Sequence, residues 1–250
     1  MEQREKIKAE IREYYNKMFS SRNDTSKHEL PHKIISPAER YFKNRKLNVA
    51  LSLANLKPNT HILEIGCATG IFSFMLTEQG FLVTGLDISD EAVAKANKIA
   101  NHNKIKEANF VQGDVENMKF PDNSFDCVFS FSAFRYLPDL NRALREVYRV
   151  LKPGGVAVID FPNKYCPWFK HLKTKFGVNI HIHDHHYGGR EVKSFFENAN
   201  FKKVEYKKIL FTPTETPSYL LPFFKIIDFV GEKTPLFKEM AGIIMCKGIK

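Results

Sequence analysis

Short apolar runs alternate with amphipathic stretches through the middle of the chain. Runs of four to seven residues, the length of buried strands, lie at 61–65, 81–86, 109–112, 125–131 and 156–161. Between them, apolar residues recur at helical spacing, which predicts helices at 70–79, 89–103 and 140–151. Strands that alternate with helices of this length are typical of a parallel sheet with right-handed crossovers. The pattern therefore predicts an α/β fold whose ligand binds beyond the carboxyl ends of the strands.

The two ends of the chain have patterns of their own. Residues 2–19 and 37–56 predict helices, the second beginning at Pro37 behind a Ser36 cap. After residue 162 the pattern predicts a helix at 190–198 and strands at 201–211 and 241–246. We expect a single domain over 1–250, made of a helical N-terminal segment (1–56), a core (57–161) and a last segment (162–250) that holds an insert and the final strands.

Composition places the chain among ordinary globular proteins. Hydrophobic residues make up 43% and charged residues 26% of the 250 positions. No run of about 18 apolar residues predicts a membrane span, and the charged N-terminus lacks the apolar core of a secretory signal. Four cysteines without paired spacing favour reduced thiols. We therefore expect a cytoplasmic protein.

The net charge of +10 is unevenly distributed. Residues 1–50 carry a balance of +5, residues 51–160 a balance of −2 and residues 161–250 a balance of +7. Basic flanks of this kind attract an anionic ligand, a nucleic acid or a membrane surface, or they are solvated lysines that confer solubility.

A glycine turn, Glu64-Ile65-Gly66-Cys67-Ala68-Thr69-Gly70, follows the first core strand and precedes a helix. Gly66 permits positive φ and a close approach of the backbone to a ligand. A dinucleotide fold would show G-x-G-x-x-G here, whereas this turn has only Gly66 and Gly70. Glu64 stands two positions before Gly66, where an acid disfavours a phosphate and suits a cationic ligand. The turn therefore argues against phosphate-binding nicotinamide chemistry.

Two acids follow the next two strands. Asp87 ends the second strand, 17 residues after Gly70, and a carboxylate there can accept both hydroxyls of a ribose. Ser89 is better placed than Asp87 to cap the following helix. Asp114 follows the third strand, where it either accepts from an exocyclic amine or serves as a turn residue.

Together these strand ends resemble the class I S-adenosylmethionine-dependent methyltransferases. The resemblance is carried by HILEIGCATGIFS, LDIS, QGDVENMKFPDNSFDCVFSFSAFRYL and ALREVYRVLKPGGVAVIDF. It covers about residues 40–211 and is strongest over 61–161. It implies a Rossmann-like three-layer sandwich with a seven-stranded, mostly parallel sheet in the order 3-2-1-4-5-7-6, the seventh strand antiparallel. It further implies an N-terminal helical lid over 1–56, a cofactor-binding core over 57–161 and an acceptor-side insert after the fifth strand.

The resemblance also implies a site for S-adenosylmethionine and its product S-adenosylhomocysteine. The backbone from Gly66 through Cys67 and Ala68 to Gly70 would pack against the methionine part, with Glu64 behind the turn. The family commonly has glycine where Ala68 stands. The remaining implied contacts are Asp87 to the ribose hydroxyls, Ile88 to the adenine face, Asp114 to the adenine amine, Val115 to a ring nitrogen, and Ser130 and Phe131 near the sulfonium.

Two missing motifs narrow the acceptor. Members that methylate exocyclic nitrogens carry an Asn/Asp-Pro-Pro-aromatic motif where this chain has Ser130-Phe131-Ser132-Ala133. Members that methylate pyrimidine carbon-5 need a cysteine nucleophile there, but Cys127 lies inside the predicted strand as a buried thiol. We therefore expect a small-molecule acceptor, with oxygen favoured over nitrogen and nucleic acid disfavoured. The alternatives are a non-catalytic cofactor-binding partner subunit and an RNA methyltransferase drawn by the basic flanks.

Three features outside the core carry hypotheses. In the segment His181–Tyr187 the histidine spacing does not match a metal site, and the sequence has no second ligand cluster. One of His185 and His186 is predicted to contact the acceptor. The alternative is that the segment is a polar loop packed on the lid. The apolar stretch 219–230 is either a helix that is buried or roofs the pocket, or an apolar face for a lipid surface or a lipid-like acceptor. Tyr14, Tyr15 and Phe19 either close the site as part of the lid or anchor their helix.

Overall fold

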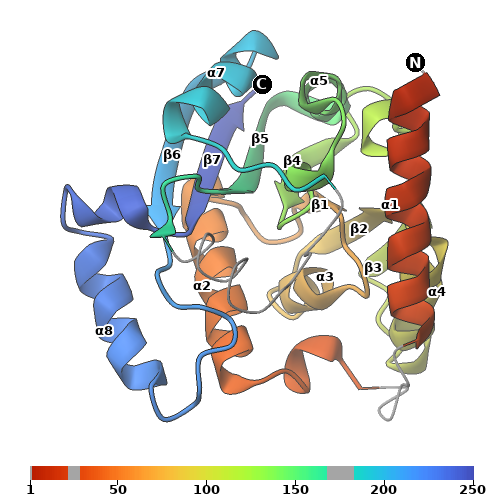
Figure 1. The fold of residues 1–250 in the computed structure, drawn as a ribbon. Helices are drawn as coiled ribbons and strands as arrows, with labels where there is room; N and C mark the ends of the chain where they lie inside the picture. The colour runs from red at the N-terminus through yellow and green to blue at the C-terminus, as the bar shows by residue number, and fades with distance from the viewer. Residues whose placement is uncertain (1, 22–28, 168–182) are drawn as a thin grey trace.

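A seven-stranded sheet forms the centre of the computed structural model, which describes residues 2–21, 29–167 and 183–250 (Figure 1). Its strands are β1 (His61–Ile65), β2 (Leu82–Asp87), β3 (Ala108–Gln112), β4 (Phe125–Ser130), β5 (Leu151–Pro162), β6 (Lys202–Ile209) and β7 (Ile243–Ile249). They are ordered β3-β2-β1-β4-β5-β7-β6. The first five pair in parallel, and β7 is antiparallel to both of its neighbours. The predicted fold class and strand order are confirmed.

Helices cover both faces of this sheet. They are α1 (Glu2–Ser21), α2 (Pro37–Ala54), α3 (Ile71–Thr77), α4 (Asp90–His102), α5 (Leu140–Val150), α7 (Gly189–Asn198) and α8 (Leu221–Gly231). Short 3₁₀ turns lie at η1 (Pro31–Lys33), η2 (Val115–Asn117), η3 (Phe134–Tyr136) and η4 (Phe237–Met240). Caps fix two of the helix starts, because Ser36 accepts from the amide of Glu39 and Ser89 from that of Ala92, both at 3.1 Å. Both caps agree with the sequence-based prediction.

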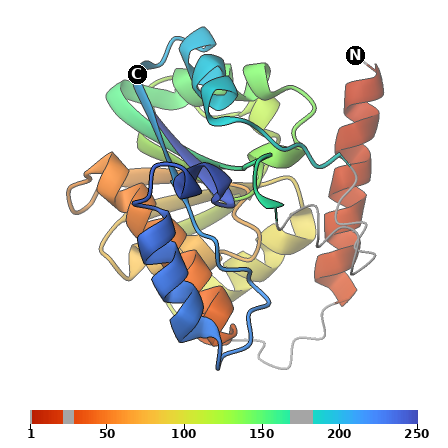
Figure 2. The same cartoon turned by 60° about the vertical axis from the view of Figure 1, so that its left-hand side comes forward.

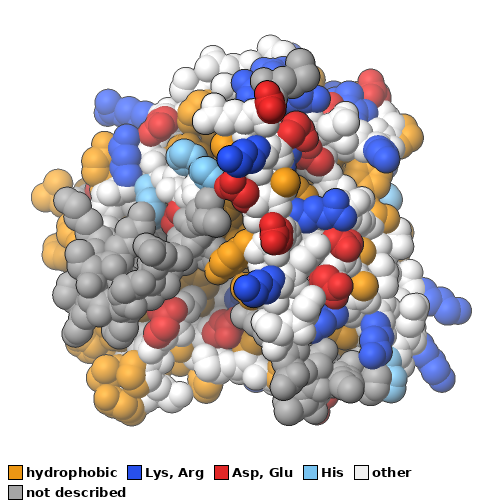
Figure 3. Space-filling view, turned by 45° about the vertical axis from the view of Figure 1, so that its right-hand side comes forward, with side chains coloured by type: hydrophobic (Ala, Val, Ile, Leu, Met, Phe, Trp, Pro, Cys, Tyr) orange, Lys and Arg blue, Asp and Glu red, His pale blue; other side chains and the backbone are white. Residues whose placement is uncertain are grey.

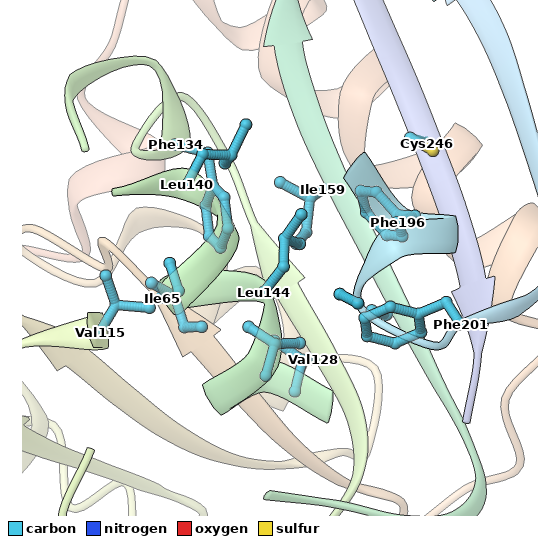
Figure 4. Packing of buried hydrophobic residues seen from close by; sticks show 14 of the residues in the cluster. Ile65, Val115, Val128, Phe134, Leu140, Leu144, Ile159, Phe196, Phe201 and Cys246 are labelled. Atoms are coloured by element: carbon cyan, nitrogen blue, oxygen red, sulfur yellow. The ribbon is translucent and has the colours of Figure 1, made fainter. Parts of the chain in front are cut away.

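Alternation along the central strands divides the core in two. On β4, Val128 points to the cluster formed with α5 and α7, which Figure 4 shows around Leu144, Ile159 and Phe196. Its neighbours Cys127 and Phe129 point to the opposite cluster, formed with α2 and α3. Period-two alternation on a strand buried on both faces explains why these runs are continuously apolar.

Two predicted elements differ from the structure. Pairing of β5 begins at Leu151, directly after α5, rather than at Val156, and the register against β4 shifts where Lys152-Pro153-Gly154-Gly155 bulges. Of the two alternatives for residues 219–230, the helix that is buried or roofs the pocket is wrong, and the exposed apolar face agrees with the structure. Phe223, Ile226 and Phe229 of α8 are exposed, whereas Leu221 and Asp228 are buried and Asp228 bonds to α2 (Figure 2).

Candidate functional site

A cavity of about 340 Å³, here called the first cavity, lies at the carboxyl ends of β1 to β4 beneath α1. Its volume falls within the usual range for small-molecule sites. The predicted site residues that line it are Gly66, Ala68, Asp87, Ile88, Asp114, Val115 and Phe131. Positions spread over 66 residues of sequence thus meet in one place, because parallel strands bring their carboxyl ends to the same edge.

Other predicted site residues support this cavity without lining it. Glu64 is buried and accepts a hydrogen bond from the Ser73 hydroxyl; burial raises the pKa of its carboxyl to about 8. Ser130 is buried and donates to the carbonyl of Ile65 at 2.9 Å. Cys67 is buried, and Gly70 caps α3 at φ +84°. Ser130 and Gly70 therefore hold the strand ends in place, while Glu64 and Cys67 line a neighbouring cavity.

The glycine turn is shaped by positive φ at successive points. Gly66 has φ +74°, and a Cβ there would lie 2.3 Å from the Cβ of Ala133. Ala68 has φ +48°, a left-handed conformation that glycine adopts at no steric cost. A hydrogen bond from its amide to Oδ2 of Asp87, at 2.8 Å, holds Ala68 in this conformation. The site therefore accepts alanine where the resembling family commonly has glycine.

Asp87 links the first two strand ends. Its Oδ2 accepts from Ala68 and its Oδ1 from the amide of Ser89 at 2.9 Å. Burial raises the pKa of this carboxyl, and hydrogen bonds from the backbone of Ser89, Ala68 and Ile88 oppose that shift. A carboxylate offers about four acceptor positions, so Asp87 can still accept from a ribose hydroxyl.

α1 covers the first cavity with Lys8, Ile11, Tyr15, Met18 and Phe19. Of the aromatic residues named from the sequence, Tyr15 and Phe19 line the cavity, while Tyr14 is 39% exposed. The outer surface of the molecule on this side carries Lys, Arg, Asp and Glu in close alternation, as Figure 3 shows. α1 thus turns an apolar stripe inward and a mixed charged surface outward, as a helix lying over a pocket does.

Lys8 fixes α1 to the end of β3, a role that the sequence pattern does not predict. Its Nζ lies 2.7 Å from Asp114 and 2.8 Å from the buried carboxylate of Glu116. Burial alone would lower the pKa of Lys8, but the two carboxylates raise it above its ordinary value. Asp114 also caps η2 by accepting from the amide of Glu116, so its predicted turn role is confirmed and its ligand role stays a prediction.

A second aromatic contact closes the same roof. The rings of Tyr15 and Tyr136 lie 6.1 Å apart, and both side chains line the first cavity. Burial raises the pKa of both phenols, that of Tyr136 to about 12. Both phenols therefore stay protonated at neutral pH. Tyr136 lies in the stretch SFSAFRYL after β4, but nothing in its spacing along the sequence predicts a contact with α1.

A second cavity of about 490 Å³ meets the first at the glycine turn. Both are lined by Gly66, Ala68, Phe131 and Ser132, while Phe42, Lys46 and Phe72 line only the second. The residues that follow β1 and β4 thus form a wall shared by the two cavities.

Lys46 is the charged group of the second cavity. It is 2% exposed, pairs with the buried Asp160 at the end of β5, and donates to the Ser132 hydroxyl at 2.8 Å. Burial lowers the pKa of Lys46, and Asp160 opposes that shift. Its ammonium lies 5.4–5.9 Å from the ring centroids of Phe42, Phe72 and Phe131. Asp160 accepts from the amide of Ser132, so this pair fixes the turn between the two cavities.

The histidine segment packs on the lid side of the molecule. Asp184 pairs with Arg135, the His185 amide donates to the Arg135 carbonyl at 3.0 Å, and His183 lies 3.4 Å from Glu10 of α1. Neither His185 nor His186 is among the described residues that line the two cavities. Contact of either with an acceptor therefore stays a prediction, and His181 lies outside the described residues.

The lining of the first cavity fits an adenosyl sulfonium compound. Asp87 supplies acceptors for a diol, Asp114 an acceptor for an amine, and Ile88 and Val115 apolar faces for a ring. Side chains at Gly66 or Gly113 would collide with neighbours, Gly113 with Leu86 at 2.6 Å. Close packing of the protein therefore favours glycine at both positions in the cavity wall. These features define a Rossmann-like nucleoside-binding site of the methyltransferase type.

Comparison with known proteins agrees. The family model described as a methyltransferase domain matches residues 56–200, and the chain belongs to that family. It is 34% identical over 127 residues to demethylmenaquinone methyltransferase of Listeria welshimeri, covering 49% of this chain and 53% of that protein. It is 39% identical over 103 residues to sterol 24-C-methyltransferase of Gibberella zeae, covering 40% and 27%.

The chain thus spans about half the length of the first of these relatives and less of the second. Among solved structures, a Thermotoga maritima S-adenosylmethionine-dependent methyltransferase superposes with a TM-score of 0.64 at 20% identity, covering 85% of this chain and 91% of that one. This similarity supports the fold.

Proposed function

We propose that this protein binds S-adenosylmethionine in the first cavity and transfers its methyl group to a small, largely apolar molecule in the second. The observation that carries the proposal is the convergence of Gly66, Asp87 and Asp114 on one cavity that shares a wall with another. Of the relatives named above, one is a demethylmenaquinone methyltransferase and another a sterol 24-C-methyltransferase.

The chemistry asks little of the protein beyond alignment. S-adenosylmethionine would supply a methyl group activated on a sulfonium: the acceptor atom would bond to the methyl carbon in line as the carbon–sulfur bond breaks, and S-adenosylhomocysteine would leave. Asp87 and the glycine turn hold the donor's position, Phe131 and Ser132 form the wall that the acceptor must face, and α1 excludes water.

The acceptor side supports an apolar ligand with one polar group. Phe42, Phe72 and Phe131 supply aromatic walls, and Lys46 supplies a buried cation. Between oxygen and nitrogen, oxygen is favoured because Ser130-Phe131-Ser132-Ala133 stands where members that methylate exocyclic nitrogens of bases or amides carry their motif. An oxygen acceptor has to lose a proton, and a cation near it stabilises the oxyanion.

Titration calorimetry with S-adenosylhomocysteine tests the cofactor half of the proposal. Asp87→Asn removes a charged acceptor while keeping its size, which should weaken binding about 10- to 100-fold. Glu91→Gln, on the exposed first turn of α4, is the matched control and should bind as the parent does. Absence of heat with both S-adenosylmethionine and S-adenosylhomocysteine would refute the assignment.

Turnover separates the enzyme from a non-catalytic cofactor-binding subunit. Release of S-adenosylhomocysteine is measured with a phenol, a hydroquinone, an apolar amine and RNA as candidate acceptors. Product with the phenol or hydroquinone supports the proposal, and product with RNA alone refutes it. His185→Ala and His186→Ala are compared in the same assay; unchanged turnover and acceptor KM in both would remove the predicted acceptor contact.

A further inference from the structure

α8 leaves much of its apolar surface uncovered. Its buried positions are Leu221, Asp228 and Gly231, and Asp228 is 1% exposed. Its outward positions include Phe223, Ile226 and Phe229, which are 61%, 63% and 63% exposed. A surface helix normally turns its apolar stripe to the core and its polar face to solvent.

Specific bonds hold α8 in this orientation. The carboxylate of Asp228 accepts from the amides of Phe211 and Thr212, from the Thr212 hydroxyl and from the Tyr41 hydroxyl on α2. One turn later, Glu232 pairs with Arg45 of α2 and accepts from the Leu210 amide. Rotating the helix to bury its outward apolar side chains would leave these donors buried without acceptors, which costs free energy. The outward apolar face is therefore fixed by the fold.

The face continues past the end of α8. Val230 is 54% exposed, and the segment leading into η4 presents Leu236 at 84% and Phe237 at 61%. Figure 1 shows α8 at the side of the molecule opposite α1, away from the roof of the first cavity. Contiguous exposed apolar surface of this kind marks an interaction site.

The exposed charge around this face is positive. Lys225, Lys233 and Lys238 are exposed, and Lys233 lies 3.6 Å over the ring of Phe229. The neighbouring acids are already paired, Glu232 with Arg45 and Glu239 with Lys208. Lysines with long apolar stems suit the boundary between water and lipid headgroups, where the stem is buried and the ammonium meets phosphate.

We propose that the face formed by Phe223, Ile226, Phe229, Val230, Leu236 and Phe237, with its three lysines, docks on an anionic lipid membrane surface. A second copy of the chain is a poorer occupant, because a two-fold contact would place the same lysines against each other. The interaction is peripheral: among residues 2–21, 29–167 and 183–250 no helix is long and apolar enough to cross a bilayer. The proposal goes beyond methyl transfer and does not depend on it.

The arrangement also places the membrane near the second cavity. Thr214 and Glu215, on the segment between β6 and α8, line that cavity together with residues of α2. α2 in turn carries Tyr41 and Arg45, which hold α8. α2 and the segment between β6 and α8 thus border both α8 and the second cavity. An acceptor dissolved in the lipid would therefore have a short path from the membrane surface to this cavity.

Co-sedimentation of the full chain with vesicles tests the proposal. The vesicles are phosphatidylcholine alone, or phosphatidylcholine with about one third phosphatidylglycerol. Binding is expected to the anionic vesicles and to be weak on phosphatidylcholine alone. The triple variant F223S/I226S/F229S should lose at least about tenfold in partition, and K225Q/K233Q/K238Q about fivefold for each lysine at low salt.

Matched controls change the same residue types elsewhere. I34S/L82S removes two other exposed apolar side chains, and K17Q/K98Q/K119Q removes three exposed lysines from other helices and loops. Both controls should pellet much as the parent does. Because the altered α8 positions are exposed, thermal unfolding of the variants should match the parent.

Several outcomes overturn the proposal. No pelleting with anionic vesicles, or equal loss in the control and α8 variants, removes the membrane assignment. A dimer in light scattering that F223S/I226S/F229S dissociates would assign the face to a second copy instead. None of these results bears on calorimetry with S-adenosylhomocysteine, so failure here is distinguishable from failure of the proposed function.

Discussion

Lys8 and Asp114, 106 residues apart in sequence, form an ion pair of 2.7 Å that joins α1 to the end of β3. Asp114 is also the residue predicted to accept from the adenine amine. One Asp114 oxygen accepts from Lys8 and the other from the Glu116 amide. The same carboxylate therefore anchors the roof of the first cavity and borders its interior.

Lys8→Met is expected to loosen α1. The variant removes the ammonium shared by Asp114 and the buried Glu116, so α1 loses the polar anchor that lies at the first cavity itself. We expect affinity for S-adenosylhomocysteine to fall about tenfold, a loss of about 1.4 kcal/mol, and α1 to become sensitive to limited proteolysis. Lys17→Met, exposed on the same helix, is the control. Unchanged affinity with unchanged proteolysis would show that the other contacts of α1, such as Arg4 with Asp139 and Arg12 with Asp90, hold the helix without Lys8.

The buried pair Lys46 and Asp160 predicts a non-additive effect on stability. Lys46→Met leaves the carboxylate of Asp160 buried without its cation, which should lower the free energy of unfolding by about 3–5 kcal/mol. Adding Asp160→Asn should restore much of this loss, because no uncompensated charge then remains. Lys43→Met, three residues earlier on α2 and paired more loosely with Glu39, should cost less than about 1 kcal/mol. Urea unfolding measures the parent, Lys46→Met, Asp160→Asn, the double variant and Lys43→Met, and additive effects of Lys46→Met and Asp160→Asn would contradict the expectation.

Glu64 predicts a pH dependence of stability with a defined sign. Its pKa is about 8 in the folded protein against an ordinary value of 4.5, so the folded state holds the extra proton between these values. Stability is therefore greatest below pH 4.5 as far as this group is concerned, and falls as the pH rises toward 8. Glu64→Gln should flatten this decline by about 5 kcal/mol over the pH range from 4.5 to 8, as measured by urea unfolding at several pH values. Glu13→Gln, exposed on α1, should leave the profile unchanged; equal profiles for parent and Glu64→Gln would contradict the prediction.

The core and the strand-end residues were predictable because local rules decide them. The strand His61–Ile65 and the caps at Ser36 and Ser89 follow from apolar periodicity and side-chain hydrogen bonding within a few residues. Asp87 follows from its place after a strand. These signals are read over short windows of sequence, and tertiary packing did not override them.

Pairs between distant segments were not predictable in this way. Lys8 in α1 resembles any lysine of a charged helix, and only the packing of α1 over β3 gives it Asp114. Residues 219–230 admitted two alternatives for a similar reason. Their apolar composition suits either a buried helix or an exposed apolar face, and the bonds of Asp228 to Thr212 and Tyr41 on other elements decide which side of α8 faces inward.

Gly66 lets the steric demand of the glycine turn be separated from its conformational demand. Gly66 and Gly80 have similar positive φ values, +74° and +83°, but different surroundings. A Cβ at Gly80 would meet nothing within 4 Å, whereas one at Gly66 would lie 2.3 Å from the Cβ of Ala133. Gly80→Ala should therefore cost only the left-handed strain of about 1–2 kcal/mol.

Gly66→Ala should cost more than Gly80→Ala and also weaken S-adenosylhomocysteine binding, because the end of β1 or the Ala133 turn must move. Adding Ala133→Gly removes the colliding methyl group, whose carbon is the only atom closer than 3.6 Å. The double variant should then be destabilised no more than Gly80→Ala and should regain most of its affinity. Urea unfolding and calorimetry on the four proteins check this. If Ala133→Gly gave no rescue, the need for glycine at position 66 would lie in its backbone conformation, and the contact between β1 and the end of β4 would not shape the cavity.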